Sequence, residues 1–89
     1  MKTIWKYKLE VEDKQIISVP MGFTILKVGM QFGYPFLLVE VDDENKKVEV
    51  EIFIFGTGHP INVSYLKYIG TFFVDEGYLV FHVFYSNKE

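Results

Sequence analysis

Residues 71–85 read TFFVDEGYLVFHVFY, two hydrophobic runs separated by the Asp-Glu-Gly triplet at residues 75–77. Phenylalanine, tyrosine and valine favour β-strands, and a short gap that contains glycine between two such runs is typical of a β-hairpin. The segment therefore predicts two antiparallel strands, at residues 71–74 and 78–85. This hairpin is the strongest local indication of the fold.

Strand patterns continue toward the N-terminus. Trp5, Tyr7 and Leu9 alternate with charged residues, which is the period of two expected of a half-buried strand. Further runs rich in β-branched and aromatic residues end at glycine, proline or a polar turn. Besides the hairpin, the predicted strands cover residues 2–10, 15–19, 24–31, 36–41 and 48–55.

The connections predict how these strands pair. Residues 24–31 and 36–41 are close enough in the chain to form a hairpin, and the polar residues 42–47 predict a solvated hairpin loop. A helical pattern is present at residues 62–68, where Asn62 is a possible N-cap and Gly70 resembles a C-terminal cap.

The whole pattern predicts an all-β protein. The expected fold is a small antiparallel sandwich or barrel of about six or seven strands with one short helical turn. Eighty-nine residues suit one domain, so residues 1–89 are interpreted as a single all-β domain.

Composition excludes several classes of function. The chain has no cysteine, which rules out disulfides, thiolate zinc sites and cysteine nucleophiles. The formal net charge is −3 and no basic run is present, so duplex nucleic acid is not an expected partner. No apolar stretch has the length of a membrane helix or the form of a signal peptide. We therefore expect a cytoplasmic protein that does not bind membranes.

The aromatic content is high for so small a chain. It contains nine phenylalanines, six tyrosines and one tryptophan, and both faces of the strand at residues 78–85 are apolar. One interpretation is a central strand covered on both sides within the domain. The other is association with a second copy, because large exposed apolar surfaces usually mark interfaces. The second interpretation predicts a homo-oligomer.

The segment Gly-Thr-Gly-His-Pro at residues 56–60 is the most distinctive motif. Two glycines allow positive φ angles and a close backbone approach, so successive amides could face an anion. The alternative is a tight turn that needs glycine for its backbone angles. The predicted ligand-binding residues are Gly56, Thr57, Gly58, His59, Pro60, Lys67, Tyr68 and His82.

Evidence for catalysis is weak. No serine lies in a nucleophile-elbow context, and the carboxylates occupy turns and solvated strand faces. His59 and His82 form the only histidine pair, but no metal-ligand spacing is present. We therefore expect no enzyme, no catalytic residues, no metal and no cofactor.

Five segments together carry a family resemblance that covers most of the chain. They are IWKYKL at 4–9, DKQII at 13–17, GTGHPI at 56–61, YIGT at 68–71 and LVFHVF at 79–84. In this combination the chain resembles a family of short uncharacterised proteins encoded by bacteriophages and prophages. Members of that family often have basic residues before the glycine loop, where this chain has Glu49 and Glu51.

The resemblance implies a small non-enzymatic accessory protein of the phage type. One possible function is an anti-defence sponge, a homo-oligomer that sequesters a nucleotide immune signal in the host cytoplasm. The alternatives are a protein-binding module that inhibits a host protein and a structural or accessory virion protein.

Overall fold

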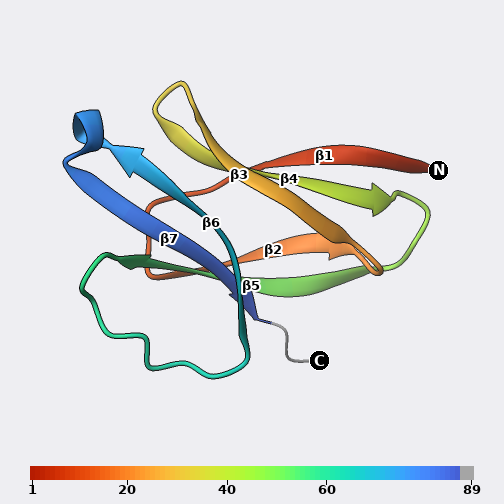
Figure 1. Cartoon of the computed structure of the whole chain (residues 1–89). Helices are drawn as coiled ribbons and strands as arrows, with labels where there is room; N and C mark the ends of the chain where they lie inside the picture. The colour runs from red at the N-terminus through yellow and green to blue at the C-terminus, as the bar shows by residue number, and fades with distance from the viewer. Residues whose placement is uncertain (87–89) are drawn as a thin grey trace.

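Two antiparallel sheets form the computed structural model, which describes residues 1–86 (Figure 1). The described elements are the strands β1 (Lys2–Lys8), β2 (Lys14–Pro20), β3 (Thr24–Gln31), β4 (Tyr34–Asp42), β5 (Lys47–Gly56), β6 (Leu66–Val74) and β7 (Leu79–Ser86), and the 3-10 turn η1 (Asp75–Gly77). The predicted all-β class and the number of strands are confirmed.

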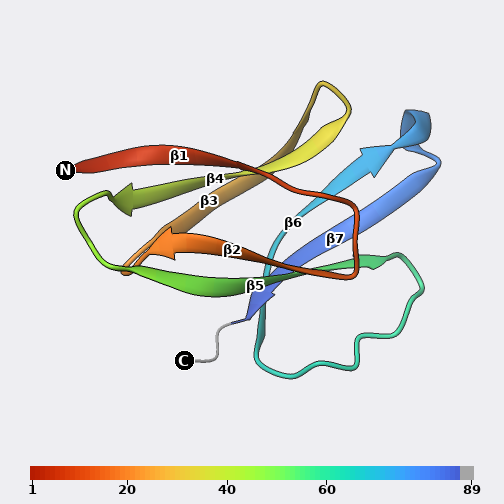
Figure 2. The ribbon, with the colours of Figure 1, turned by 180° about the vertical axis from the view of Figure 1, so that it is seen from behind.

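The strand order is not that of a simple meander. Sheet A has the order β1-β4-β3, and sheet B has the order β2-β5-β7-β6. Figure 2 shows from behind how the chain passes between the sheets after β1, β2 and β4. The predicted hairpins β3–β4 and β6–β7 are confirmed. The prediction of a hairpin loop at residues 42–47 is wrong, because β4 and β5 belong to different sheets.

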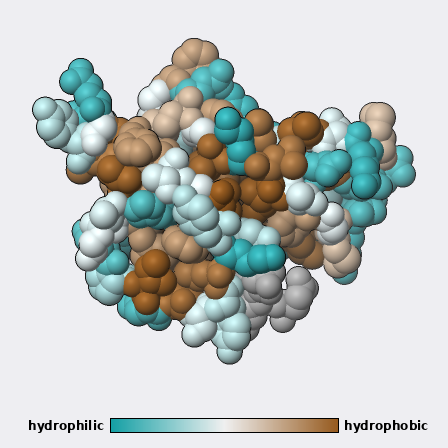
Figure 3. Space-filling view, viewed as in Figure 1, coloured by the Kyte–Doolittle hydropathy of each residue, from teal (hydrophilic) through white to brown (hydrophobic). Residues whose placement is uncertain are grey.

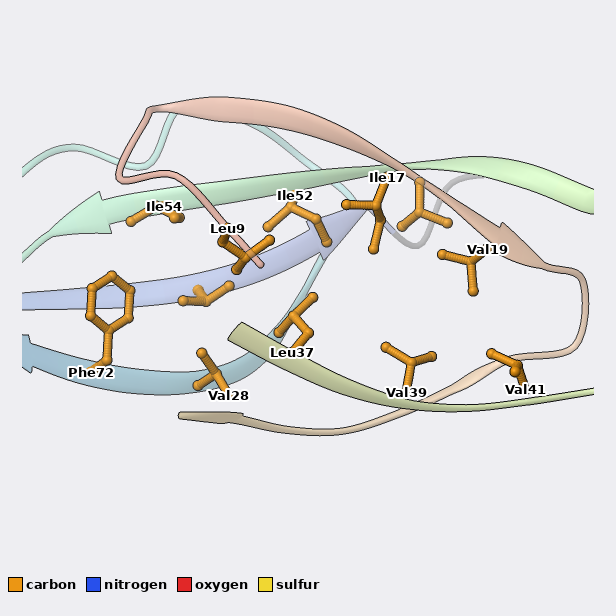
Figure 4. Close-up of a cluster of buried hydrophobic side chains, with 12 residues drawn as sticks. Leu9, Ile17, Val19, Val28, Leu37, Val39, Val41, Ile52, Ile54 and Phe72 are labelled. Atoms are coloured by element: carbon orange, nitrogen blue, oxygen red, sulfur yellow. The ribbon is translucent and has the colours of Figure 1, made fainter. Parts of the chain in front are cut away.

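The inner faces of both sheets form one hydrophobic core. Along β4 the residues Leu37, Val39 and Val41 are buried, and the residues between them are only partly covered. Figure 4 shows such side chains meeting between the sheets. Full burial of each aliphatic side chain contributes about 1.5–3 kcal/mol. This core is the main source of stability in the described residues.

Two contacts join the sheets along their edges. A Cβ atom added to Gly70 of β6 would lie 2.5 Å from Val28 Cγ1 of β3, so these two strands approach very closely. At β1, the Tyr7 hydroxyl donates a hydrogen bond to the Ser18 carbonyl of β2, at 2.7 Å. The sandwich is therefore joined on both sides.

The helical turn predicted at residues 62–68 is wrong. These residues have no helical structure, and β6 already begins at Leu66. Gly70 is not a helix cap but lies within β6, next to a register shift. The helical turn occurs instead at η1, between β6 and β7. A few helical residues are only marginally stable, so the pairing of Tyr68 with Phe84 outweighs the local preference.

Within residues 1–86, no helix is long and hydrophobic enough to cross a lipid bilayer.

Candidate functional site

The outer face of sheet B carries four neighbouring aromatic rings from three strands. We call Phe53, Phe55, Tyr68 and Phe84 the aromatic cluster. The rings of Phe53 and Phe55 stack with centroids 6.4 Å apart, and Phe84 meets Phe55 edge to face at 5.7 Å. Tyr68 meets the other side of Phe84 at 5.4 Å. Tyr68 is 58% exposed, so the cluster reaches the solvent.

A row of polar side chains continues from this cluster. His82 lies opposite Phe55 on β5 and opposite Thr71 on β6. Its Nε2 is 2.7 Å from Thr57 Oγ1, and its Nδ1 is 2.9 Å from Thr71 Oγ1. The Tyr68 hydroxyl is 2.5 Å from Thr71 Oγ1. Tyr68 therefore belongs to both the aromatic cluster and the polar row.

The carbonyl at the end of the row determines the direction of its hydrogen bonds. The Val80 carbonyl can only accept, so the Thr57 hydroxyl, 3.4 Å away, donates to it. Thr57 then accepts from His82 Nε2–H, and the unprotonated Nδ1 accepts from Thr71. Thr71 in turn accepts from Tyr68. In the neutral imidazole this arrangement puts the proton of His82 on Nε2 and gives every donor in the row an acceptor.

The glycine loop forms a tight turn. The His59 amide donates to the Gly56 carbonyl at 3.1 Å, and the Thr57 amide donates to the Val80 carbonyl at 3.2 Å. Gly58 has a φ of +89°, which favours glycine over other residues. The amides of Thr57 and His59 therefore form hydrogen bonds within the protein and are not free to bind an anion. The geometry favours a turn that positions Thr57 beside His82.

Five predicted site residues lie outside the polar row, and two of them are Gly56 and Gly58 of the glycine loop. The His59 ring packs over Gly56, 3.1 Å from the position of an added Cβ atom. Pro60 lies in an exposed segment outside the strands. Lys67 pairs with Tyr85, so it points to the opposite side of sheet B from Tyr68. The structure thus brings together Thr57, Tyr68 and His82.

Sequence reasoning missed Thr71, Phe55 and Phe84 as site residues. Their proximity to His82 depends on the register of β5, β6 and β7, including the shift between Tyr68 and Gly70. The sequence signal for these residues is the alternation along the final hairpin, which puts His82 and Phe84 on the same face of β7. The alternation alone does not show which residues of β5 and β6 lie beside them, because that depends on the register.

The site has no arrangement typical of metal binding. Among residues 1–86, no group of three histidine or carboxylate side chains is close enough to hold a metal ion. The available chemistry is hydrogen bonding by hydroxyl and imidazole groups beside aromatic rings.

Comparisons with known proteins give the family of the chain. Neither the search of curated proteins nor the search of solved structures found a match. A family profile with the description Domain of unknown function (DUF7352) matches residues 1–89. Because this match covers the full sequence, the chain belongs to that family.

Proposed function

We propose that this protein is a non-enzymatic binding protein that holds a nucleotide on the outer face of sheet B. The observation that carries the proposal is the continuity of the aromatic cluster with the Thr57–His82–Thr71 row. A nucleobase has a flat face that stacks on aromatic rings and an edge of donors and acceptors. Tyr68 and Phe84 supply the stacking surface. The hydroxyl oxygens of Thr57, Tyr68 and Thr71, which His82 holds in place, keep lone pairs that can accept hydrogen bonds from a base.

A second copy of the chain would complete this site. A sheet face forms only one wall, whereas ligand sites usually enclose most of the ligand surface. Exposed apolar residues remain in the single chain, and Figure 3 shows brown hydrophobic surface around the middle of the viewed face. Large exposed apolar patches usually mark interfaces. These features support a homo-oligomer that encloses the nucleotide between subunits.

The biological setting of the proposal comes from the family resemblance. A phage-encoded protein of this type would act in the host cytoplasm as an anti-defence sponge, sequestering a nucleotide immune signal without chemical change. In this proposal the glycine loop positions Thr57 and does not itself hold a phosphate group.

A thermal-shift assay with a panel of cyclic and ADP-ribose-type nucleotides tests the proposal. Binding to the native state at a hundredfold excess over Kd adds about 2.7 kcal/mol to the free energy of unfolding, so the melting temperature rises by several degrees. Tyr68→Ala and His82→Gln should remove this rise. Phe73→Ala is the matched control, because Phe73 is also on β6 and also 58% exposed but lies opposite Val80.

Two outcomes would contradict the proposal. One is a melting temperature that no nucleotide in the panel changes, and the other is full binding by both Tyr68→Ala and His82→Gln. If the protein ignores the panel but binds and inhibits a host protein, the protein-binding module replaces this proposal. Native mass spectrometry of protein from infected cells reports the number of subunits and any retained nucleotide in one measurement.

A further inference from the structure

The outer face of sheet A carries a separate surface, on the opposite side of the sandwich from the nucleotide site. Its register places Lys6 and Lys27 on either side of Leu38, and Lys8 beside Phe36. Within residues 1–86, none of these three lysines has a carboxylate within ion-pair distance. These lysines gather on one face of a protein whose net charge is −3. The same face also carries Glu40, opposite Ile4 and Thr24, at the end away from the β3–β4 hairpin tip.

Two of these lysines lie over aromatic rings. Lys8 Nζ is 3.6 Å from the centroid of Tyr34, and Lys6 Nζ is 4.8 Å from the centroid of Phe36. The far edge of the Phe36 ring lies over Gly29, where an added Cβ atom would be only 2.8 Å from Cζ. Glycine at this position therefore lets the ring lie across the strand. We call Lys6, Lys8, Lys27, Phe32, Tyr34 and Phe36 the basic aromatic face.

Phe32 extends this face at the tip of the β3–β4 hairpin. It is 88% exposed and has a φ of +53°, in the left-handed region that bulky residues avoid. Phe32 and Gly33 form a two-residue loop between Gln31 and Tyr34, where Asn-Gly is the preferred pair. A phenylalanine here adds backbone strain and exposes its ring. Such strain is typical of binding positions.

We propose that the basic aromatic face binds single-stranded nucleic acid. Proteins that bind single strands combine lysines along the phosphate backbone with aromatic rings on which successive bases stack. The pocket lined by Lys6, Lys8 and Phe32 has a volume of about 190 Å³, below the usual range for small-molecule sites. An extended ligand that lies across the sheet fits this surface better than an enclosed one. Bases can stack on these rings only when they are unpaired.

The charge at the neighbouring hairpin tip disfavours a membrane as the partner. Figures 1 and 2 show the β3–β4 and β6–β7 hairpin tips at the same end of the molecule. The second tip carries the exposed Asp75 and Glu76. These carboxylates would repel an anionic bilayer that Phe32 approached, whereas a single strand can follow the lysines along the sheet.

Fluorescence anisotropy with a labelled oligothymidylate of about twelve nucleotides tests the proposal. Phe32→Asn should weaken binding about tenfold or more, because it removes a stacking ring. The same variant should unfold at a higher temperature, since asparagine tolerates the left-handed backbone. Tyr65→Asn is the matched control, because Tyr65 is also exposed and has a φ of +67° but lies outside this face. We expect it to bind like the wild type.

A second pair of variants tests the role of charge. Lys8→Gln should lower the affinity and flatten its dependence on salt concentration, because fewer counterions are released on binding. Lys46→Gln removes an exposed lysine from the β4–β5 connection and should leave both quantities unchanged.

Failure of the proposal would be clear from the same measurements. It is overturned if the wild type does not bind the oligonucleotide at low salt, or if Phe32→Asn and Lys8→Gln bind as well as the wild type. Binding to vesicles with anionic lipid, without binding to the oligonucleotide, would assign the face to membranes instead. The nucleotide proposal is unaffected by these outcomes, because its variants lie on the other sheet.

Discussion

His82 shows how a polar residue is accommodated in an apolar strand. Its neighbours in the chain are Phe81 and Val83, yet each ring nitrogen meets a threonine hydroxyl. A covered polar group without a partner costs about 1–3 kcal/mol, so these two threonines stabilise the histidine in its place. The same contacts fix the orientation of the imidazole ring beside Phe55.

The hydrogen-bond direction predicts the tautomer of His82. Because Thr57 donates to the Val80 carbonyl, the neutral imidazole should carry its proton on Nε2. Nitrogen-15 NMR of the histidine side chains at pH above 7.5 or so, where free histidine is neutral, distinguishes the two tautomers. His82→Gln identifies the signals. A proton found on Nδ1 would reverse the assignment of donors along the row.

At the scale of elements, the approach of β3 to β6 holds one side of the sandwich together. Gly70 leaves room for Val28, and any larger residue would overlap it. Overpacking of this kind typically costs about 1–3 kcal/mol, because a strand or a side chain must move.

Gly70→Ala should therefore lower the free energy of unfolding by about 1–3 kcal/mol. Val28→Ala removes the methyl group that an alanine at position 70 would overlap. Val28→Ala should therefore lower the free energy of unfolding less in the Gly70→Ala variant than in the wild type. Urea unfolding of the two single variants and the double variant measures this coupling. Strictly additive effects would show that the contact does not limit the approach of the strands.

The opposite side of the sandwich depends on Tyr7. Its hydroxyl donates to Ser18 of β2, and burial raises the pKa of Tyr7 above its ordinary value of about 10. Tyr7→Phe should lower the free energy of unfolding at neutral pH by about 0.5–1.5 kcal/mol.

This difference should depend on pH in a defined direction. A raised folded pKa means that the stabilising contribution is complete below about pH 10 and is lost as pH rises through the folded value. The wild type should thus lose stability relative to Tyr7→Phe only in alkaline solution. Unfolding curves from neutral pH to about pH 11 measure the difference. A constant difference over that range would contradict the assignment to Tyr7.

At the scale of the whole molecule, the question is what covers the remaining apolar surface. Tyr68, Tyr78 and Leu79 are each about half exposed or more on the β6–β7 hairpin. A homo-oligomer would bury such residues, and its stability would then depend on protein concentration.

The melting temperature should rise with protein concentration if the chain self-associates. Each tenfold increase stabilises a dimer by about 1.4 kcal/mol by mass action. Differential scanning calorimetry over a hundredfold concentration range, together with light scattering, measures this effect. A melting temperature that does not change with concentration, together with a light-scattering mass of one chain, would exclude the homo-oligomer. The nucleotide site would then consist of the outer face of sheet B alone.

Much of the fold could be predicted because strands have a simple signature. The alternation of Trp5, Tyr7 and Leu9 reports directly which face of β1 is covered. The connection at residues 42–47 was misassigned because a polar turn looks the same whether it joins paired strands or strands of different sheets. Residues 62–68 were misassigned because pairing with a distant strand outweighed a local preference.

The candidate site was less predictable because it depends on register. Thr57, Tyr68 and His82 were selected from their types and positions, and the structure places them in one row. Thr71 joins them only through the pairing of β6 with β7. A change of one residue in that register would turn Thr71 to the inside of the sandwich.

The position of β7 between β5 and β6 has a consequence for biosynthesis. During translation β7 is the last of the seven strands to leave the ribosome, yet it is the strand that joins β5 to β6. Until it emerges, β2 and β5 can pair, but β6 has no neighbour in its own sheet. The nascent chain therefore exposes the edges of sheet B until β7 has emerged, and this is the stage most open to aggregation and to chaperones.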